Sequence, residues 1–434
     1  MNILYVADNS DRLNWGCRGT SIALRELLAR EHRIVGVASG KMVEARYPVS
    51  DKVSGPIFTK ISRHLYRRKA RKVPVLGPAL MGTIESLGDP IGISHDLDQT
   101  LANIEKARAY SPAAQRLFDG FEKCDAVVVN GEGDLIFTTP ARQTLLYTLA
   151  VCHLALKHGK PVYYVNAMVS PCPRTGINKE TVELAASILS RCALFVVRDP
   201  ASLDFVREHM PNVKATALPD ALFSWRNRFM PVDITSPASI ERFVPFFEGT
   251  GHAPPKVANG PYIAVSGSSL AARDQARARQ SYGNLVRELK KLNIPLLLIP
   301  TCTGDAFMSQ VAADTGEELL PLDTPILAGA AILANARAFV SGRWHPGIMA
   351  ALGGTPSVFM GSNSHKTLAI QTQLGYEDPR EFNAFPSPED CVAITARTAA
   401  LLAEGEARRQ RGLDISRRLA AEAESCLDLI RQAA

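Results

Sequence analysis

Short apolar segments alternate with helical patterns from one end of the chain to the other. Each segment is apolar at successive positions, which is typical of parallel strands that helices cover on both faces. In the first half they span residues 3–6, 34–37, 126–129, 162–165 and 194–197, and in the second half 262–265, 295–299, 339–340 and 357–360. This pattern predicts an α/β protein with two Rossmann-like, doubly wound domains.

A region without periodicity separates the two sets of strands. Residues 225–260 are rich in Pro, Phe and Gly, so we expect a linker there. We accordingly assign residues 1–225 to an N-terminal domain, 226–260 to the linker and 261–434 to a C-terminal domain.

Two further segments extend this plan. Residues 41–122 are too long for a simple connection, so we expect an insertion with a helix in its later part, near residues 101–121. Apolar residues share one face at helical spacing between Leu413 and Arg431, which predicts a final helix that packs on the body of the protein.

Composition narrows the class of protein. Of the 434 residues, 46% are hydrophobic and 21% are charged, which is typical of a globular protein. The net charge of +6 is a mild excess that favours an anionic ligand and argues against a nucleic-acid partner. The chain has no apolar run long enough to cross a bilayer and begins with a strand pattern, so we expect a cytoplasmic protein.

Cysteine usage gives no sign of a metal centre or a disulfide framework. The eight cysteines are scattered, without a CxxC pair and without a histidine at zinc-ligand spacing. We interpret them as reduced thiols and expect no metal site. Cys17 is kept as a candidate catalytic thiol.

The segment from residue 338 to 366 carries the strongest functional signal. It predicts a strand, a tight turn, a helix that begins near Pro346 and stops at Gly353, and a second strand. Arg343 and His345 then stand at a helix N-terminus and at the carboxyl end of a parallel strand, where anions and other ligands bind. The alternative is structural: the histidine packs in the core and the arginine pairs with a carboxylate.

Two loops of the N-terminal domain add polar candidates. Asn14 and Gly16 lie in a glycine-containing loop after the first strand, which suits a phosphate, a carboxylate or an acceptor group. Asn130, Glu132 and Asp134 follow the third strand, where carboxylates act as general bases toward sugar hydroxyls or hydrogen-bond to them. Both loops also fit a structural interpretation, in which glycines allow a positive φ and polar residues form turns.

Cationic and hydroxyl side chains complete the candidate set. Arg198 follows the fifth strand beside Asp199. It either forms a structural pair or reaches the interdomain cleft, where a guanidinium binds a carboxylate or phosphate through two parallel hydrogen bonds. In the second domain Ser268 and Ser269 end a strand as hydroxyl donors suited to a phosphate, and Lys366 adds a positive charge.

Several motifs, in this order, resemble the polysaccharide pyruvyl transferase family: NWGCRGT, NGEGD, VVRDPAS, LPDALF and SGRWHPGIMAALGGTPSVFMG, followed by Lys366. The resemblance implies a GT-B-like architecture, in which two Rossmann-like domains face a cleft. It also implies transfer of the enolpyruvyl group of phosphoenolpyruvate to a sugar as a pyruvate ketal. By this resemblance Arg343 and His345 are the donor-binding and catalytic pair, and Arg198 is a second donor-binding arginine.

Two positions depart from the family pattern. Cys17 stands where the family commonly has an acidic residue, and Glu132 interrupts what are often consecutive glycines. Both lie on the side expected to bind the acceptor, so they bear on the identity of the sugar and not on the donor. The expected acceptor residues are Asn14, Gly16, Asn130, Glu132 and Asp134.

The chemistry of this donor fits the residues. Phosphoenolpyruvate carries a carboxylate and a phosphate, so its site needs converging cations and N–H donors. A histidine gives and takes protons near neutral pH, and we expect no cofactor besides this co-substrate. On this interpretation His345 and Arg343 are catalytic, and the donor is bound by Arg198, Ser268, Ser269, Arg343 and Lys366.

Two other functions stay open. One is a glycosyltransferase that uses a nucleotide-sugar on the same scaffold, although the helix after Arg343 has no Glu to bind a ribose. The other is a non-catalytic glycan-binding relative, against which the presence of both Arg343 and His345 argues.

A basic cluster lies in the insertion. Seven Lys and Arg residues fall between Lys60 and Lys72. A charge run is usually a solvated face, and the alternative is a patch for anionic lipids or an anionic glycan. If the cluster binds anionic lipids, we expect the protein to work at the inner face of the membrane, on a lipid-linked saccharide acceptor.

Overall fold

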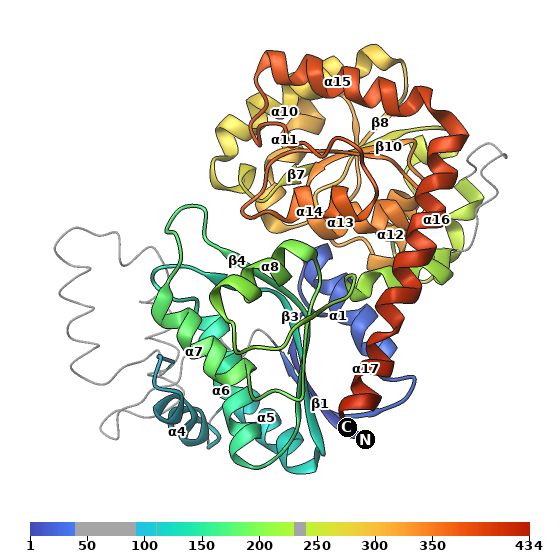
Figure 1. Ribbon diagram of the computed structural model, residues 1–434. Coiled ribbons are helices and arrows are strands. Elements are labelled where there is room, and N and C mark those ends of the chain that lie inside the picture. Colours follow the sequence, from blue (N-terminus) through green and yellow to red (C-terminus); the bar gives the residue numbers. More distant parts are fainter. Residues whose placement is uncertain (40–92, 110, 230–239) are drawn as a thin grey trace.

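Two parallel sheets organise the chain, one in each lobe of the molecule (Figure 1). The computed structural model describes residues 1–39, 93–109, 111–229 and 240–434. The first sheet has six strands in the order β2-β1-β3-β4-β5-β6, and the second has five in the order β11-β10-β7-β8-β9. Each described strand runs parallel to its neighbours. The two Rossmann-like domains predicted from the apolar segments are therefore confirmed.

The first lobe alternates strands with helices along the chain. Its strands are β1 (Asn2–Asp8), β2 (Arg33–Ser39), β3 (Ala126–Phe137), β4 (Val162–Pro171), β5 (Leu194–Val197) and β6 (Thr216–Ala217). Its helices are α1 (Trp15–Leu28), α4 (Leu97–Ala107), α5 (Pro112–Lys123), α6 (Gln143–Lys157), α7 (Lys179–Leu189) and α8 (Pro200–His209), followed by the 3₁₀ helix η3 (Ala221–Phe229).

Alternating side chains of the first sheet face two different helical layers. Leu4 and Val6 point to a core that includes α5, α6 and α7, whereas Ile3 and Tyr5 point to a core that includes α1 and the C-terminal helix α17 (Cys426–Ala433). Because the sheet is covered on both faces, its strands are apolar at successive positions.

The third strand is much longer than its apolar segment. We expected a strand that ends at Val129 and a polar loop after it, but β3 continues to Phe137 and pairs with β4 as far as Pro171. The pairing shifts register between Glu132 and Leu135, and Glu132 has a φ of +36°. Sequence rules assign NGEGD to a turn because they cannot see the pairing partner that keeps this backbone extended.

Part of the expected insertion belongs to the lobe itself. The helix expected near residues 101–121 is two helices, α4 and α5, which lie in the crossover from β2 to β3 and contribute to the same core as α6. The break occurs where Ser111 caps α5 and Pro112 takes its first position. The remaining part of the segment, residues 41–92, lies outside the described residues.

The second lobe repeats the plan with shorter strands. Its strands are β7 (Ile263–Ser268), β8 (Leu296–Leu298), β9 (Glu318–Leu319), β10 (Ala338–Gly342) and β11 (Ser357–Phe359). Its helices are α9 (Val244–Phe247), α10 (Gln275–Leu289), α11 (Phe307–Thr315), α12 (Ile326–Asn335), α13 (Trp344–Leu352), α14 (Lys366–Gln373), α15 (Pro388–Ala403) and α16 (Gly405–Glu424). The two-residue strands β6 and β9 were not predicted, because two residues are too few to show a pattern of apolar positions.

The expected linker is largely built into the lobes. Trp225 lies in η3, and Phe243 and Phe247 follow residues 230–239, which lie outside the described part. All three side chains are buried in the core of the second lobe. The Phe-rich composition that suggested an irregular linker instead supplies packing surface.

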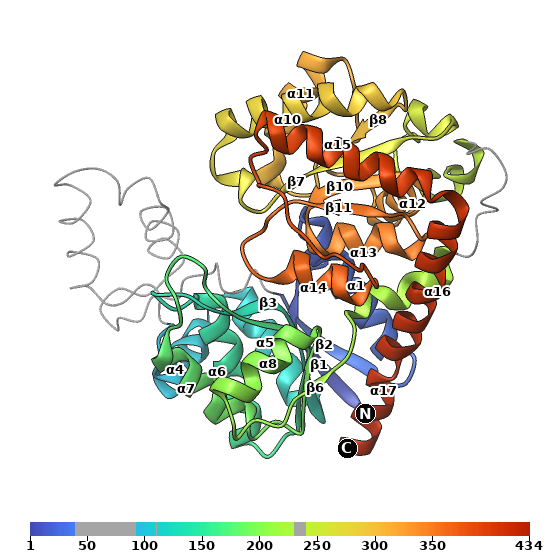
Figure 2. The same cartoon turned by 45° about the horizontal axis from the view of Figure 1, so that its top comes forward.

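The C-terminal helices connect the two lobes. The helix expected between Leu413 and Arg431 is broken at Ser425, so that α16 leaves the second lobe and α17 packs on the first sheet through Leu427 and Ile430. Figure 2 shows α16 and α17 running along one side of the molecule, with the two termini close together. No helix in the described ranges is both long enough and apolar enough to cross a membrane.

Candidate active site

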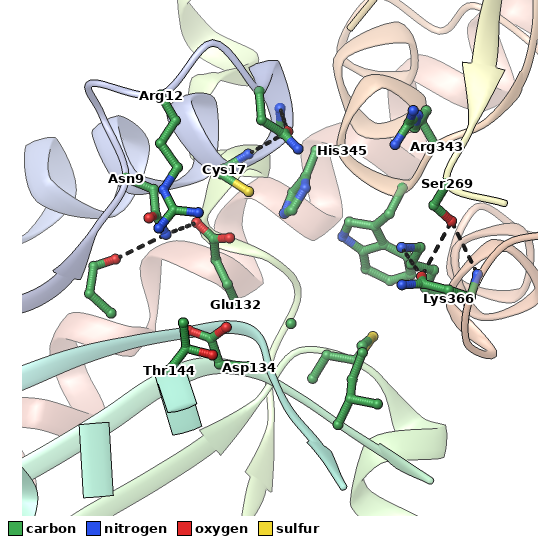
Figure 3. Close-up of a pocket in the computed structure, with 18 of the residues that line it drawn as sticks. Asn9, Arg12, Cys17, Glu132, Asp134, Thr144, Ser269, Arg343, His345 and Lys366 are labelled. Carbon is green, nitrogen blue, oxygen red and sulfur yellow. Dashed lines mark hydrogen bonds between the residues drawn. The ribbon is translucent and has the colours of Figure 1, made fainter. Parts of the chain in front are cut away.

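A cavity of about 350 Å³ lies between the two lobes, at the carboxyl ends of both sheets. In Figure 3, Asn9, Arg12, Cys17 and Glu132 gather on one side and Arg343 and its neighbours on the other, with His345 between them. Open α/β sheets place their ligands at this edge. The structure therefore brings candidates from both halves of the sequence into one space.

The turn between β10 and α13 has the predicted form. β10 ends at Gly342, Arg343 is the N-cap residue of α13, and the helix ends at Leu352, before Gly353 and the left-handed Gly354. The first two residues of α13, Trp344 and His345, have backbone N–H groups without an acceptor in the helix, whereas Pro346 at the third position has no N–H. Both Arg343 and His345 line the cavity.

His345 is held by a buried carboxylate that the sequence analysis did not assign. Asp220 Oδ2 lies 3.2 Å from His345 Nε2 and 3.1 Å from Arg198 Nη1. Its Oδ1 accepts hydrogen bonds from Thr20 Oγ1 at 2.7 Å and from the backbone N–H of Leu222 at 3.0 Å. Burial alone would raise the pKa of this carboxyl, but His345 and Arg198 outweigh burial and hold the pKa well below its usual range.

The imidazole of His345 has a partner in either protonation state. A protonated Nε2 donates to Asp220, and an unprotonated Nε2 accepts from Arg198 Nη1, which lies 3.0 Å away. The other ring nitrogen, Nδ1, lies against the first turn of α1, where only 2.5 Å would separate it from a Cβ atom added to Gly16. Gly16 thus admits the ring, and this arrangement suits a residue that exchanges protons.

Arg198 lines the cavity but is only 2% exposed. Its Nη1 contacts Asp220 and His345, and its guanidinium lies 4.8 Å from the ring of Trp344. Its Nε has no hydrogen-bond partner among the described residues. The sequence left open whether Arg198 forms a structural pair or faces the cleft, and in the structure this side chain does both.

Arg343 faces the cavity, and one side of its guanidinium group is already paired with a carboxylate. Its Nη2 donates to the fully buried Asp305, and its Nε has no hydrogen-bond partner in the described part of the chain. Burial opposes the charged form, but Asp305 outweighs it, so the pKa of Arg343 is raised. The side chain therefore stays cationic and retains donors for a ligand.

Lys366 begins α14 and lines the cavity next to Asn363, whose Oδ1 accepts from its Nζ at 2.7 Å. Burial, followed by the positive charges of Arg343 and Arg198, lowers the pKa of Lys366 to about 7. Arg343 and Arg198 each have a buried carboxylate partner, but their charges still disfavour the protonated form of Lys366, and a bound anion would relieve this effect.

The two serines of the expected donor site separate. Ser269 lines the cavity and accepts a hydrogen bond from the backbone N–H of Asn363. Ser268 is fully buried and donates to the carbonyl oxygen of Gly361 at 2.6 Å. Ser268 therefore joins two loops behind the site and is not placed to contact a donor.

The expected acceptor residues also divide. Glu132 and Asp134 line the cavity, and so do Asn14 and Gly16. Asn130 is fully buried, donates to Ser21 Oγ and accepts from Asn166, behind the cavity wall. It is a structural residue, because the strand that carries it does not end there.

Asn14 has a structural task as well. Its Oδ1 accepts from the backbone N–H groups of Gly16 and Cys17 at 3.0 and 3.2 Å, which caps α1. Its side-chain oxygen is therefore used in the helix cap, and only its other atoms are left to contact an acceptor sugar.

Two ionisable groups on this side are shifted toward their protonated forms. Burial raises the pKa of Cys17 well above its usual range, and Glu132 adds to the effect. A protonated thiol is a poor nucleophile, so the structure does not favour Cys17 as a catalytic thiol. Burial also raises the pKa of Asp134, although Arg142 opposes it.

A profile of polysaccharide pyruvyl transferases matches residues 21–364, which is most of the chain. The chain belongs to the polysaccharide pyruvyl transferase family. The resemblance identified from the motifs is thereby confirmed, and with it a transferase that acts on polysaccharides. No curated protein sequence matches the chain.

Solved structures agree with the fold of this pyruvyl transferase family member. The UDP-GlcNAc 2-epimerase of Neisseria meningitidis, bound to UDP-GlcNAc, has a TM-score of 0.54 at 11% identity, over 100% of both chains. A variant of Os79 from O. sativa, in complex with UDP, has a TM-score of 0.53 at 13% identity, over 100% of this chain and 99% of that one. The GT-B-like architecture is therefore confirmed, and identity this low shows the fold alone.

Sequence reasoning missed several residues of this pyruvyl transferase site. Asp220 lies in the motif LPDALF, to which the sequence analysis assigned no function. Asp305 follows the strand expected at 295–299. Both positions could therefore have been recognised from the sequence. Asn9 and Arg12 lie directly after β1, which was a signal too, whereas nothing marked Arg142. Within the described ranges, no group of three His, Cys, Asp or Glu side chains could hold a metal ion.

Proposed function

We propose that this family member transfers the enolpyruvyl group of phosphoenolpyruvate to a sugar and forms a pyruvate ketal. Two hydroxyl oxygens of the sugar bond to C2 of the donor, the methylene carbon gains a proton, and the bond between C2 and the phosphate oxygen breaks. The two hydroxyl protons balance the reaction, one ending on the new methyl group and one on the released phosphate. Such a site must bind a dianionic phosphate and a carboxylate and must move protons.

The observation that carries the proposal is the convergence of cations around His345 in one cavity. Arg343 and Lys366 line the second-lobe side, Arg198 lies beside His345, and the start of α13 adds backbone N–H donors. Guanidinium groups bind carboxylate or phosphate with charge-assisted hydrogen bonds, and a helix N-terminus favours anions. A donor with two anionic groups is well matched to this set.

Proton transfer to the methylene carbon is assigned to His345. Asp220 orients the ring, and Arg198 Nη1 is placed to donate to Nε2 when the proton has left. A positioned acid of this kind contributes about 10²- to 10⁴-fold to a rate. His345→Ala should therefore lower the transfer rate by about 10²- to 10⁴-fold and leave donor binding largely intact.

Donor binding measured by calorimetry tests the proposal. We expect phosphoenolpyruvate to bind and UDP-GlcNAc not to bind, with Arg343→Ala weakening the donor by about 1.5 to 3 kcal/mol, or about 10- to 150-fold in Kd. Arg343→Lys should recover little, because an ammonium group cannot pair bidentately. Arg207→Ala is the control, since that side chain is 70% exposed on α8. Tight binding of UDP-GlcNAc without phosphoenolpyruvate would favour the glycosyltransferase instead.

A further inference from the structure

Glu132 occupies a backbone conformation that favours glycine. Its φ of +36° lies in the left-handed region, within strand β3 and between Gly131 and Gly133. Residues other than glycine are strained there, and such strain persists where the side chain has a function that needs the position. The chain thus holds a carboxylate at a place where glycine would fit without strain.

The carboxylate of Glu132 lies beside an amide with an unused acceptor. Asn9 Nδ2 donates to Glu132 Oε1 at 3.1 Å and lies 3.3 Å from the carbonyl oxygen of Ala7. These two acceptors identify that end of the amide as its NH₂ group. Its Oδ1 is buried and contacts no hydrogen-bond donor in the described part of the chain. Asn9 and Glu132 both line the cavity, so a buried amide oxygen without a donor and a carboxylate lie together in its wall.

Glu132 and His345 both lie beside the first turn of α1. The ring of His345 lies against Gly16, and Glu132 is close enough to the thiol of Cys17, the next residue, to help raise its pKa. Figure 3 shows Asn9 and Glu132 joined by a hydrogen bond on the side of the cavity away from Arg343 and Lys366. A ligand that donates hydrogen bonds to Asn9 and Glu132 therefore lies next to His345.

We propose that Asn9 and Glu132 bind the two hydroxyls of one sugar ring that become the ketal oxygens, and that Glu132 is the base for the first of them. The inference rests on the proposed function. As the first oxygen bonds to C2, its proton moves to Glu132 while the methylene carbon takes a proton from His345. Before the next turnover Glu132 releases this proton to solvent and His345 takes one up from solvent. The second hydroxyl donates to Asn9 Oδ1 until its oxygen displaces the phosphate, which leaves with the electron pair of the C–O bond and gains that hydroxyl's proton.

Asp134 is the other carboxylate on this wall, and its surroundings differ. It interacts with Arg142 and Thr144 at the start of α6, and burial raises its pKa. Among the described residues, Asp134 makes no hydrogen bond to an asparagine side chain of the kind that joins Glu132 to Asn9. Glu132 is therefore the carboxylate placed for a sugar hydroxyl, and Asp134 belongs to the α6 side of the cavity.

The test uses methyl glycosides of glucose, galactose and mannose as acceptor probes, together with forms in which one hydroxyl of each diol is methylated. Binding is followed by saturation-transfer NMR with phosphoenolpyruvate present, and turnover by phosphate release. We expect at least one free-diol glycoside to bind and its methylated forms to bind at least tenfold more weakly. A wild-type protein that binds the donor but none of these glycosides contradicts the inference.

Three variants separate the roles of the pair. Glu132→Gln should lower kcat by about 10²- to 10⁴-fold at unchanged donor Kd, as expected for loss of a base. Asn9→Ala should raise the KM for the glycoside about tenfold with a smaller effect on kcat. Glu132→Gly should lose turnover while its melting temperature stays equal or rises, because glycine adopts this φ without strain.

The control is Glu208→Gln on α8, whose side chain is 76% exposed. It should change none of these values. If Glu132→Gln turns over at the wild-type rate, or if Glu132→Gly chiefly unfolds the protein, Glu132 is structural and the inference fails. Failure of wild-type protein to bind phosphoenolpyruvate is a different result, which removes the proposed function itself.

Discussion

Asp220 is the residue on which the centre of the site depends. It is fully buried, accepts hydrogen bonds from four groups and lies 3.2 Å from His345 Nε2. Its partner Arg198 is 2% exposed, so the two charges have little access to water. Removing one partner of a buried ion pair strongly destabilises the fold, because the other charge stays buried without a counterion.

Asp220→Asn should therefore destabilise the fold as well as the site. We expect the free energy of unfolding to fall by about 3 to 5 kcal/mol in urea titrations, because Arg198 loses its counterion. The control is Asp204→Asn, which breaks an arginine pair whose side chains are 70% and 74% exposed. That change should cost about 1 kcal/mol or less. Equal effects of the two substitutions would show that Asp220 does not hold a buried charge.

Lys366 predicts how donor binding depends on pH. Its pKa is lowered to about 7 in the free protein, so it is mostly neutral above that pH. A bound phosphate or carboxylate favours the charged form, so binding above pH 7 takes up a proton and weakens as pH rises. The Kd for phosphoenolpyruvate should rise between pH 7.5 and 9, by up to about tenfold per pH unit.

Calorimetry in two buffers of different ionisation enthalpy measures this proton uptake directly. Wild-type protein should take up close to one proton per donor at pH 8.5, and Lys366→Met should take up almost none and bind more weakly. A Lys366→Met protein with the wild-type pH profile would remove Lys366 from the donor site.

At the scale of elements, the first turn of α1 shapes the site. Gly16 leaves room for the ring of His345, and a Cβ atom there would approach Nδ1 to 2.5 Å. Alanine is favoured over glycine in a helix by about 0.5 to 1 kcal/mol. Glycine at this position therefore lowers the stability of the helix but leaves the space that the ring of His345 occupies.

Gly16→Ala should lower kcat at least tenfold while the protein stays folded, because the imidazole must move away from its partners. The matched control is Gly283→Ala in α10, where the nearest side-chain atom would lie 3.7 Å from the new Cβ. That variant should gain about 0.5 to 1 kcal/mol of stability and keep full activity. Wild-type turnover by Gly16→Ala would mean that the position of His345 is not limiting.

Elements were predictable from the sequence where the pattern is local. The strand, turn, helix and strand around Arg343 follow from two apolar segments, a proline and two glycines, and the structure has them where expected. Strand β3 was not predictable beyond Val129, since its last residues are extended only because β4 pairs with them. The same tertiary context places Glu132 in its strained conformation.

In the whole molecule, contacts at several places hold the two lobes together around the cavity. Trp15 at the start of α1 is buried in the second-lobe core, and its indole N–H donates to the carbonyl oxygen of Leu322. On the other side His365 Nε2 lies 2.9 Å from Asp199, the residue after Arg198. Helices α16 and α17 also run from the second lobe to the first.

These connections explain which parts of the site the sequence could not predict. Asp220 and His345 are far apart in the chain and come from different lobes, so their pairing depends on how the lobes dock. Arg343 and Asp305 likewise meet only when two loops of the second sheet lie side by side. The sequence predicted which strand ends carry chemistry, because that follows from the parallel topology, but not which charges neutralise each other.

The basic cluster between Lys60 and Lys72 lies outside the described residues, and membrane attachment through it stays a prediction. We expect weak binding to vesicles that contain anionic lipid, at about 1 kcal/mol per basic residue near the surface, and loss of that binding at high salt. A variant with Arg67, Arg68, Lys69 and Arg71 changed to Ser should lose most of it in cosedimentation. Equal sedimentation of variant and parent would leave the cluster as a solvated face.

In the proposed reaction, the bond between C2 and the phosphate oxygen of phosphoenolpyruvate breaks while a sugar takes the three-carbon unit. Donor labelled with oxygen-18 at the bridging position tests it most directly, in D₂O with the methyl glycosides as acceptors and mass spectrometry of both products. We expect the label to leave with the phosphate and the glycoside to gain a ketal whose methyl group carries one deuterium. Phosphate without the label, or a glycoside without the three-carbon unit, would contradict it.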